Sequence, residues 1–340
     1  MKSVLTIKCK NGEIIARDVF SANGVILVNK DTIMNDYIKL KMLDHNIYEV
    51  QIYESAKDRR ESSKFEKQCK EYVVQIRELL RSVTLGEYSE IEEITHYMTE
   101  QIYNHIFEAD HIIHCLNNIH NMDEYTYTHS IYTALYSMLI GNWLGLTKNQ
   151  ICELISAGLL HDIGKTKIPQ EILNKKGRLE ADEFEVIKNH TLLGYGIIQE
   201  IPGLSMDIKR AVLLHHERMD GSGYPYGLNA NSISFYAKII SIADVFDAMT
   251  QNRIYKRKVS PFDSFEMFLS EGVRLFDYKI LYTFLKHMAP LYVGNKVQLS
   301  NGDIGEIVYI PPQDITNPIL FINSEYLDLS RSEIKVLQVV

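Results

Sequence analysis

Ionisable residues interrupt the apolar helical stripes in the middle of this chain, and this pattern constrains the fold more than any other. In "ELISAGLLHDIGK", His161 and Asp162 stand side by side at the end of an apolar run with helical spacing. Such a stripe faces the core, where a histidine or aspartate is costly unless it is paired or bound to a metal. The same arrangement recurs, and the full set is His129, His161, Asp162, His190, His215, His216 and Asp244. One such residue alone would be an ordinary hydrogen-bonded core residue, but five histidines and two aspartates on successive helices predict a shared polar centre.

Length and composition limit the classes of protein to which this chain can belong. At 340 residues, with 46% apolar and 24% charged residues, the chain is long enough for two or three domains of an ordinary globular protein. The net charge of −8 argues against binding of duplex nucleic acid, which needs a basic face. No stretch approaches the roughly 20 apolar residues of a membrane helix, and the start "MKSVLTIKCKNGE" lacks the apolar core of a signal peptide. We therefore expect a cytoplasmic protein without a membrane span, with its four scattered cysteines as free thiols.

Changes of pattern divide the chain into four expected segments. Residues 1–55 have short strand-like runs and turn signals around a helix capped by Thr32, and predict a small α+β domain with a regulatory or interaction role, or one that only packs. Residues 56–124 predict a helical connector whose apolar stripe is buried against the next domain; the helix at 61–82 also allows a homodimer. Residues 125–290 stay helical, and residues 291–340 predict a β-rich appendage with a hairpin turn at Asn301-Gly302. The expected fold class is mainly α, a helical bundle with a small α+β N-terminal unit and a small β-rich C-terminal appendage.

The ligand types in the central segment are typical of a metal centre. Imidazole nitrogen suits Fe, Mn, Zn or Ni, and a carboxylate adds oxygen donors that can bridge two ions. No cysteine belongs to the set, which argues against a closed structural zinc site. Two ions about 3.5–4 Å apart can generate hydroxide and stabilise both oxygens of an in-line phosphoryl displacement. His111 and His114, one helical turn apart, lack flanking third and fourth ligands and are expected to be surface or core residues.

Five motifs together carry a family resemblance. They are His129, "HDIGK" at 161–165, His190, "HHERMDGSGYP" at 215–225 and "ADVFDAMTQNRIYKR" at 243–257. The set resembles the HD-GYP family, a branch of the HD metal-dependent phosphohydrolases that cleaves bacterial cyclic dinucleotides, chiefly cyclic di-GMP. The resemblance covers about residues 125–290 and implies an HD-type helical bundle there. Diguanylate cyclase (GGDEF) domains are partners that it suggests.

The resemblance implies a role for each matched residue. The first metal ion would be held by His129, His161, Asp162 and Asp244. Asp162 would bridge to a second ion, which His190 and His215 would complete, and His216 would face this ion or a third. The remaining implied roles are phosphate contact or protonation for Lys165, pocket shape for Gly223 and Tyr224, phosphate or guanine contacts for Arg253 and Lys256, and a place near the nucleophilic water for Asp247. The implied cofactors are two divalent ions, Fe or Mn, or else Mg, Ni or Zn.

Local charge and loop chemistry agree with several of these roles. Lys165, Arg253 and Lys256 are cations beside the ligand positions of an acidic chain, and a phosphodiester needs such charges, although each alone would be an ordinary surface residue. "DGSGYP" combines two glycines with a proline, which predicts a loop of fixed and unusual dihedral angles rather than a plain turn. Glu217 would orient a histidine or lie in solvent, and Asp220 would cap or brace the loop.

One position departs from the family pattern. Many members carry a glutamate one helical turn before the first histidine, where it helps to hold a third metal, and this chain has Tyr125 there. Glu124 is adjacent, but one residue along a helix turns the side chain by about 100°. We expect a two-metal site, with a three-metal site as the alternative. Hydrolysis would accordingly stop at linear pGpG or continue to GMP.

The expected function is hydrolysis of cyclic di-GMP by a hydroxide that two metal ions activate. One alternative is an HD phosphohydrolase for another nucleotide, such as cyclic GMP-AMP or an alarmone. Another is a non-catalytic module that senses cyclic di-GMP or docks a cyclase domain, but the complete two-metal ligand set argues against it. A structural helical domain with incidental histidines does not account for the number of coordinated motifs.

Overall fold

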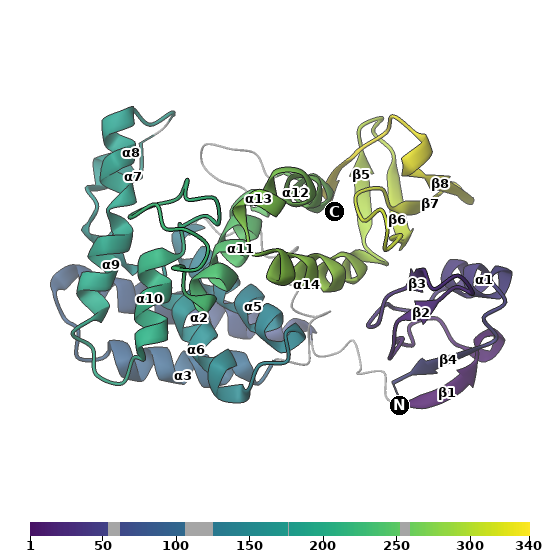
Figure 1. Ribbon diagram of the computed structural model, residues 1–340, viewed down its shortest axis with the longest axis horizontal. Helices are drawn as coiled ribbons and strands as arrows, with labels where there is room; N and C mark the ends of the chain where they lie inside the picture. The colour runs from purple at the N-terminus through teal and green to yellow at the C-terminus, as the bar shows by residue number, and fades with distance from the viewer. Residues whose placement is uncertain (54–61, 106–124, 176, 252–258) are drawn as a thin grey trace. The chain divides into compact units, whose positions relative to one another are not determined.

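The computed structural model divides the chain into two compact units (Figure 1). The helical unit comprises residues 62–258 and 268–281, and the composite unit comprises residues 1–61, 259–267 and 282–340. Within them the structure describes residues 1–53, 62–105, 125–175, 177–251 and 259–340. No helix of this described part is both long and apolar enough to cross a membrane.

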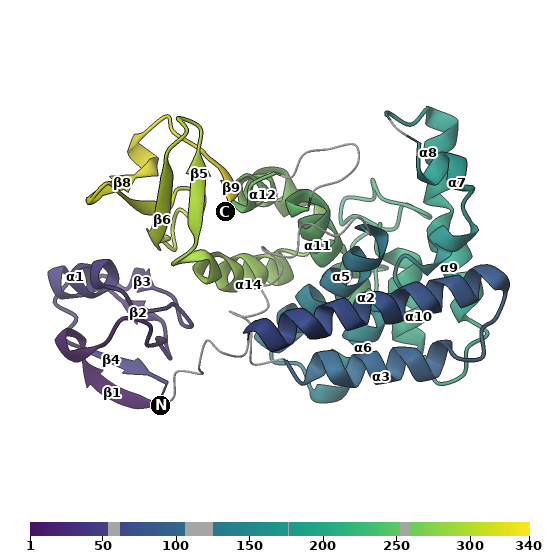
Figure 2. The ribbon, with the colours of Figure 1, turned by 180° about the vertical axis from the view of Figure 1, so that it is seen from behind.

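In its described residues the helical unit is made up of helices, most of them joined by short loops, with a longer connection at residues 215–234. Its elements are α2 (Ser62–Leu85), α3 (Ile91–Tyr103), α5 (Tyr125–Trp143), α6 (Lys148–Leu160), η3 (Ile163–Lys167), α7 (Gln170–Leu173), α8 (Ala181–Lys188), α9 (His190–Ile198), α10 (Met206–Leu214), α11 (Phe235–Thr250), η4 (Phe268–Gly272), α13 (Val273–Leu275) and the first part of α14 (Tyr278–Met288). In the view of Figure 2, α2 and α3 lie in front, and they pack on α5 and α6, respectively. The predicted mainly α fold class is confirmed.

The apolar stripe of α2 is buried, as the sequence predicts. Its described members are Cys69, Tyr72, Val73, Ile76, Leu79 and Leu80, and each is at most 8% exposed. The helix packs on α5 and η3 within its own unit. This face is therefore occupied within the helical unit.

Local sequence explains where the site-bearing helices begin and how closely they pack. Side chains of Thr147, Ser205 and Ser234 cap the N-termini of α6, α10 and α11 by accepting backbone N–H groups. Helix α6 crosses α5 at Gly158, where an added Cβ would lie 2.6 Å from the Cα of Ala134. Because only glycine fits this crossing, the end of α6 is held close to α5.

The turn after α6 also requires glycine. Gly164 in η3 lies so close to α9 that an added Cβ would lie 1.9 Å from the carbonyl oxygen of His190 and 2.4 Å from the nitrogen of Gly194. Backbone atoms cannot give way as a flexible side chain can. The glycine of "HDIGK" thus sets the short separation between Asp162 and His190.

The N-terminal part of the composite unit is small and mixed. It contains β1 (Lys2–Leu5), η1 (Thr6–Lys8), β2 (Val19–Phe20), β3 (Ile26–Val28), α1 (Asp36–Asp44) and β4 (Glu49–Ile52). Strands β1 and β4 pair antiparallel, with Lys2 opposite Ile52, and β2 pairs antiparallel with β3.

The expected cap of α1 at Thr32 is wrong. The helix begins after Asn35, whose side chain accepts a hydrogen bond from the nitrogen of Ile38 at 2.9 Å. The backbone at Thr32 is instead committed to an extended pairing, because its carbonyl accepts from the nitrogen of Ile15 at 3.0 Å. A tertiary pairing therefore overrides the local capping preference of threonine.

The C-terminal part of the composite unit is a five-stranded antiparallel sheet. Its strands are β5 (Lys296–Leu299), β6 (Ile304–Tyr309), β7 (Ile319–Ile322), β8 (Glu325–Asp328) and β9 (Val336–Val339), in the spatial order β8-β7-β6-β5-β9. The short helices α12 (Pro261–Met267), η5 (Ala289–Tyr292) and η6 (Leu329–Arg331) accompany it. The predicted turn at Asn301-Gly302 joins β5 to β6, and Gly302 has a φ of 92°.

Contacts join the two parts of the composite unit. The amide of Asn35 donates to the carbonyl of Val308 at 2.7 Å, and the ammonium of Lys286 lies 2.7 Å from the Asp18 carboxylate. The rings of Tyr37 and Tyr309 lie 5.7 Å apart. The boundaries expected at residues 55 and 291 thus separate two stretches of chain that the structure joins in one unit.

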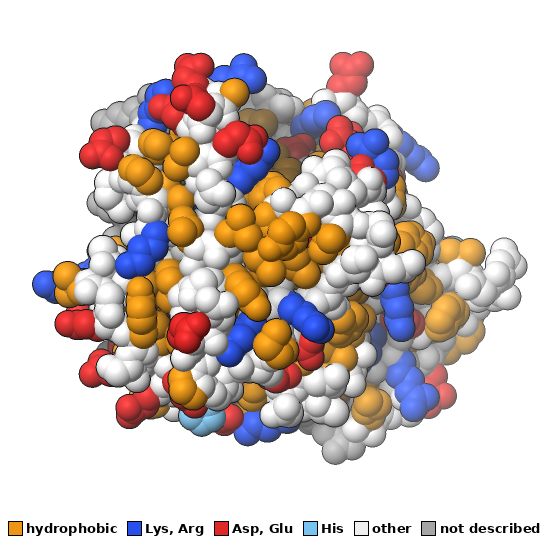
Figure 3. All heavy atoms as spheres, turned by 60° about the vertical axis from the view of Figure 1, so that its left-hand side comes forward, with side chains coloured by type: hydrophobic (Ala, Val, Ile, Leu, Met, Phe, Trp, Pro, Cys, Tyr) orange, Lys and Arg blue, Asp and Glu red, His pale blue; other side chains and the backbone are white. Residues whose placement is uncertain are grey.

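Charges of both signs are mixed on the face drawn in Figure 3. Basic side chains lie among acidic and hydrophobic ones, rather than in a continuous basic area. As far as its described atoms show, this face lacks the basic surface that duplex nucleic acid requires.

Candidate metal centre

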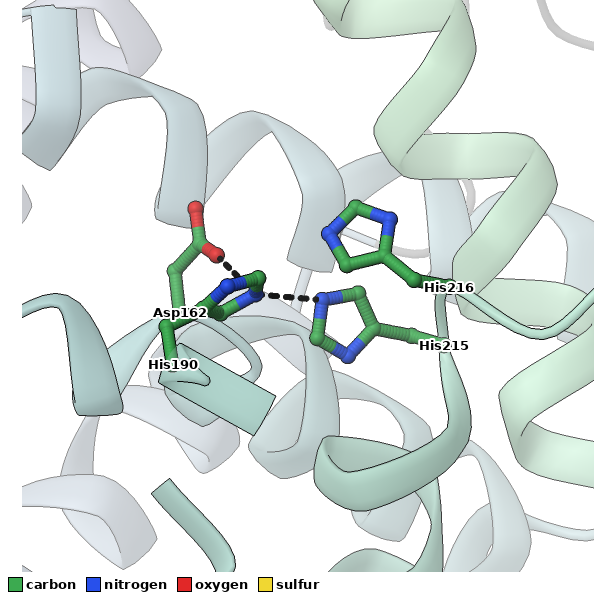
Figure 4. A group of neighbouring side chains, drawn as sticks. All are labelled: Asp162, His190, His215 and His216. Carbon is green, nitrogen blue, oxygen red and sulfur yellow. Dashed lines mark hydrogen bonds and ion pairs between the residues drawn. The ribbon is translucent and has the colours of Figure 1, made fainter. Parts of the chain in front are cut away.

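Seven ionisable side chains converge in the helical unit. His129 lies on α5 and Asp244 on α11, whereas the others lie at helix ends: His161 and Asp162 between α6 and η3, His190 at the start of α9, and His215 and His216 just after α10. One group, termed the imidazole-rich group, contains Asp162, His190, His215 and His216 (Figure 4). The other, termed the Asp244 group, contains His129, His161 and Asp244. Within each group the ligand atoms all lie within 4.8 Å of one another, so the structure brings all seven predicted ligand residues together.

Asp162 lies between the two groups. Its Oδ1 is 3.3 Å from Nε2 of His190, in the imidazole-rich group. Its Oδ2 is 3.3 Å from Nε2 of His161 and 3.6 Å from Nε2 of His129, in the Asp244 group. The two carboxylate oxygens therefore face different groups, which is the geometry of a bridging carboxylate.

Three of the histidines are oriented by the same local device. In His161, His190 and His215, Nδ1 lies 2.8 Å from the carbonyl oxygen three residues earlier. Each follows the last turn of a helix, where carbonyl groups have no partner within the helix. Because a carbonyl only accepts, Nδ1 must carry a proton, so a ring in its neutral form has its lone pair on Nε2, inside the site.

Two of these lone pairs face each other. Nε2 of His190 lies 3.3 Å from Nε2 of His215 (Figure 4). Burial lowers the pKa of His190 to about 4 and holds the pKa of His215 well below its usual range, so neither ring carries a second proton near neutral pH. Two nitrogen lone pairs at this distance are placed as two ligands of one cation would be.

The carboxylates stay charged in spite of their burial. Burial alone would raise the pKa of Asp162, but His161 and Lys165 outweigh it and hold this pKa well below the usual range. The ammonium of Lys165 lies 2.5 Å from Oδ2 of Asp162 and is partly exposed. Burial is likewise outweighed at Asp244, where a hydrogen bond from His129 lowers the pKa well below its usual value.

His129 is held by carboxylates on both ring nitrogens. Nε2 lies 3.1 Å from Oδ1 of Asp244, and Nδ1 lies 2.6 Å from Oδ2 of Asp247. Burial lowers the pKa of this imidazole, but Asp244 and Asp247 outweigh burial and raise it to about 9. Asp247 contacts Nδ1 of His129, whereas Asp162 lies near Nε2 of the same ring, and the expected place of Asp247 near the nucleophilic water stays a prediction.

Unsatisfied buried atoms show that the group fits a metal ion. Nε2 of His161 and Oδ1 of Asp162 are buried and lack a hydrogen-bond partner among the described residues. Buried polar atoms are rarely left so, and imidazole and carboxylate are donors that divalent transition metals accept. The residues present therefore fit metal binding, in agreement with the metal dependence of the predicted family.

Three expected site residues lie outside what can be described. Arg253 and Lys256 fall in residues 252–258, outside the described part. Tyr125 is the first residue of α5, but its side chain is also outside the described part. Their expected roles stay predictions, as does the assignment of His111 and His114.

The GYP loop, residues 218–228, covers one side of the centre. The ring of Tyr224 stacks on that of His216, with centroids 4.6 Å apart and planes at 25°. An added Cβ at Gly223 would lie 2.4 Å from the nitrogen of Arg218 and 2.5 Å from the carbonyl oxygen of His216. The glycine is thus needed because the loop folds back onto the backbone that follows the two histidines.

Glu217 holds this loop, a role that the sequence did not reveal. The side chain is 2% exposed, and its two oxygens accept from the backbone nitrogens of Tyr226 and Leu228, each at 2.8 Å. It therefore neither orients a histidine nor lies in solvent. Asp220 braces the same loop by accepting from Ser222, as expected. The only sequence signal for Glu217 is an acid next to the ligand pair and just before a glycine-rich loop.

Comparison with known proteins agrees with this geometry. The model of the HD domain family matches residues 108–280, just over half of the 340-residue chain. A cyclic di-GMP phosphodiesterase from Pseudomonas aeruginosa is 35% identical over 186 residues, which cover 55% of this chain and 45% of the relative. Another from Thermotoga maritima is 35% identical over 182 residues, which cover 53% of this chain and 49% of that protein.

A third relative carries a different name. The 3′3′-cGAMP-specific phosphodiesterase 1 of Vibrio cholerae is 39% identical over 144 residues, which cover 42% of this chain and 33% of that protein. In all three comparisons the chain spans half or less of the length of the relative. On the extent of the family match and on these motifs, the chain belongs to the HD domain family and is of the HD-GYP type.

Proposed function

We propose that this chain is a metal-dependent phosphodiesterase that opens cyclic di-GMP to linear pGpG. The observation that carries the proposal is the facing pair of Nε2 atoms on His190 and His215 beside the shared carboxylate of Asp162. Relatives named cyclic di-GMP phosphodiesterases support the choice of substrate.

The proposed ligand assignment follows the two groups. One ion would be held by His129, His161 and Asp244, and the other by His190 and His215 with His216 on the same side. Asp162 would be shared between the two. Iron or manganese is the proposed metal, because mixed imidazole and carboxylate donors suit both ions.

The chemistry divides between the ions and the chain. When bound, two divalent ions lower the pKa of water and neutralise charge that develops on the phosphate. Lys165, held beside Asp162 and partly exposed, contacts a non-bridging phosphate oxygen. The histidines fixed through Nδ1 hold their Nε2 atoms in place, so no reorganisation is needed when substrate arrives. Tyr224, whose ring stacks on His216, shapes the substrate pocket at the edge of the centre.

A second candidate substrate is cyclic GMP-AMP. The Vibrio cholerae relative named for this substrate is 39% identical to the chain over the matched residues, which supports cyclic GMP-AMP as a candidate. Both molecules present the same phosphodiester to the metal centre and differ in one base. The distinction therefore depends on the base pocket rather than on the metal ligands.

Metal content and product together test the proposal. Protein purified without oxygen is analysed for metals and incubated with cyclic di-GMP and, separately, with 3′3′-cGAMP, before and after chelation and resupply of Mn²⁺. We expect two ions per chain and pGpG as the product, both lost on chelation and restored by Mn²⁺. Three ions with GMP as the product would instead indicate a third site near Tyr125. Metal without turnover of either nucleotide would point to another substrate, and no metal after resupply would leave a non-catalytic module.

A further inference from the structure

His129 differs from the other oriented histidines in what holds its Nδ1. In the three histidines described above, that partner is a neutral carbonyl at 2.8 Å. In His129 it is Oδ2 of Asp247, at 2.6 Å. A charged acceptor makes a stronger hydrogen bond than a neutral one and increases the electron density on the opposite nitrogen.

Asp247 is built into the core for this contact. The residue is fully buried on α11, one turn after Asp244. Its second oxygen, Oδ1, accepts from the amide of Gln251 at 2.6 Å, and Gln251 is also buried. The amide and the imidazole fix the carboxylate from two sides, so its position behind His129 is set by the fold rather than by solvent.

The two groups of ligands therefore differ in charge. The Asp244 group has one carboxylate of its own and a second, that of Asp247, directly behind a ligand histidine. In the imidazole-rich group the carboxylate of Asp162 is shared, and the other members are imidazoles. A cation is attracted more strongly to the position with more nearby negative charge.

We propose that Asp247 is a positioning residue that acts through His129 and makes the Asp244 group the tighter of two metal positions. The inference rests on the metal centre proposed above. It implies that the two ions are bound in sequence, with the Asp244 group filled first and the imidazole-rich group second.

Titration of chelator-treated protein with Co²⁺ tests the inference. Visible absorption of Co²⁺ reports its ligands, and calorimetry gives the affinity for each equivalent. In Asp247→Asn the amide oxygen can still accept from Nδ1 of His129, but the charge is gone. We expect the first equivalent to bind about 10- to 100-fold more weakly in this variant, which is the usual cost of losing the partner of a ligand histidine. The second equivalent should change by far less.

Glu217→Gln is the matched control, because Glu217 is also a buried acid near the centre, but the hydrogen bonds described for its carboxylate go to the GYP loop. Its two Co²⁺ affinities should equal those of the unchanged protein. Unchanged affinities in Asp247→Asn, or weakening of the second equivalent alone, would overturn the inference. Unchanged protein that binds no Co²⁺ would overturn the proposed function and the inference with it.

A second measurement needs no variant and decides the matter if Asp247→Asn does not fold. Protein with ¹⁵N-labelled histidine is titrated with Zn²⁺ and followed by NMR. We expect the first equivalent to shift the Nε2 resonances of His129 and His161, and the second to shift those of His190 and His215. The reverse order would overturn the inference.

Discussion

The helical side and the loop side of the metal centre are held in place by different means. On the helical side, three ligand histidines are each oriented by a carbonyl three residues earlier. On the loop side, the GYP loop keeps its shape through Glu217, whose partners are nine and eleven residues further along the chain. The histidine contacts join residues within one helical turn, whereas the Glu217 contacts join the two ends of a loop.

This difference predicts how amino-acid substitutions on each side should affect the centre. Each histidine carries its own orientation, so ligand geometry is distributed over several independent helix ends. The loop depends on contacts across its own length, and the buried Glu217 makes two of them. Substitution of a ligand should therefore weaken metal binding, whereas substitution in the loop should weaken substrate binding and leave metal binding unchanged. The predictions that follow test this separation, from the largest expected effect to the smallest.

Asp162→Ala should have the largest effect. The carboxylate faces both groups, so its loss removes a ligand from each metal position. We expect metal content to fall below one ion per chain and hydrolysis of cyclic di-GMP to become undetectable, as measured by elemental analysis and product chromatography. Asp182→Ala, an exposed change on α8, is the control and should alter neither. Normal turnover in metal-analysed Asp162→Ala protein would contradict the ligand assignment.

Gly164→Ala should strain the helical side without touching a ligand side chain. The added Cβ meets the backbone at His190, and such overpacking costs about 1–3 kcal/mol or more in the free energy of unfolding. Denaturant unfolding followed by circular dichroism measures this change. Gly196→Ala on α9 is the control, because nothing lies within 4 Å of its added Cβ, and it should gain up to about 1 kcal/mol from better helix propensity. Equal stability of the two variants would mean that η3 can move away from α9.

Glu217→Gln should affect the loop side alone. Its side chain can accept from only one of the two loop nitrogens, and a hydrogen bond to a charged group contributes about 1.5–3 kcal/mol. We expect KM for cyclic di-GMP to rise about 10-fold or more with metal content unchanged. Glu171→Gln, an exposed change on α7, should leave KM as it was. Loss of metal in Glu217→Gln would show that the two sides are not independent.

Tyr224→Leu should have the smallest effect. It removes the stacking on His216 but leaves the loop backbone in place, and an aromatic pair contributes about 0.5–1.5 kcal/mol. We expect KM to rise about 2- to 12-fold, with kcat and metal content nearly unchanged. The neighbouring Tyr226 is 59% exposed, so Tyr226→Leu should be neutral in the same kinetic assay. A larger effect from Tyr226 would place the substrate on the outer side of the loop.

The helical side could be predicted from the sequence because its information is local. Apolar spacing located the buried stripe of α2, and ionisable residues that interrupt apolar helical stripes located the seven metal-centre residues. What the sequence could not supply depends on contacts between distant residues. Glu217 acquires its role only when the loop folds back, and Thr32 loses its expected role because Ile15 pairs with it. The contact of Asp247 with His129 follows from how α11 packs against α5, and the sequence alone did not predict it.

The make-up of the composite unit has a consequence for synthesis on the ribosome. Every ligand of the metal centre has been translated once residue 244 is made, and the helical unit is complete at residue 281. The N-terminal strands are made before the helical unit. The sheet with which they share a unit is incomplete until its edge strand β9, at residues 336–339, pairs with β5. Segments of a chain fold as their partners emerge. Residues 1–53, which are made before the helical unit, should thus reach their final packing after the helices that follow them have already folded.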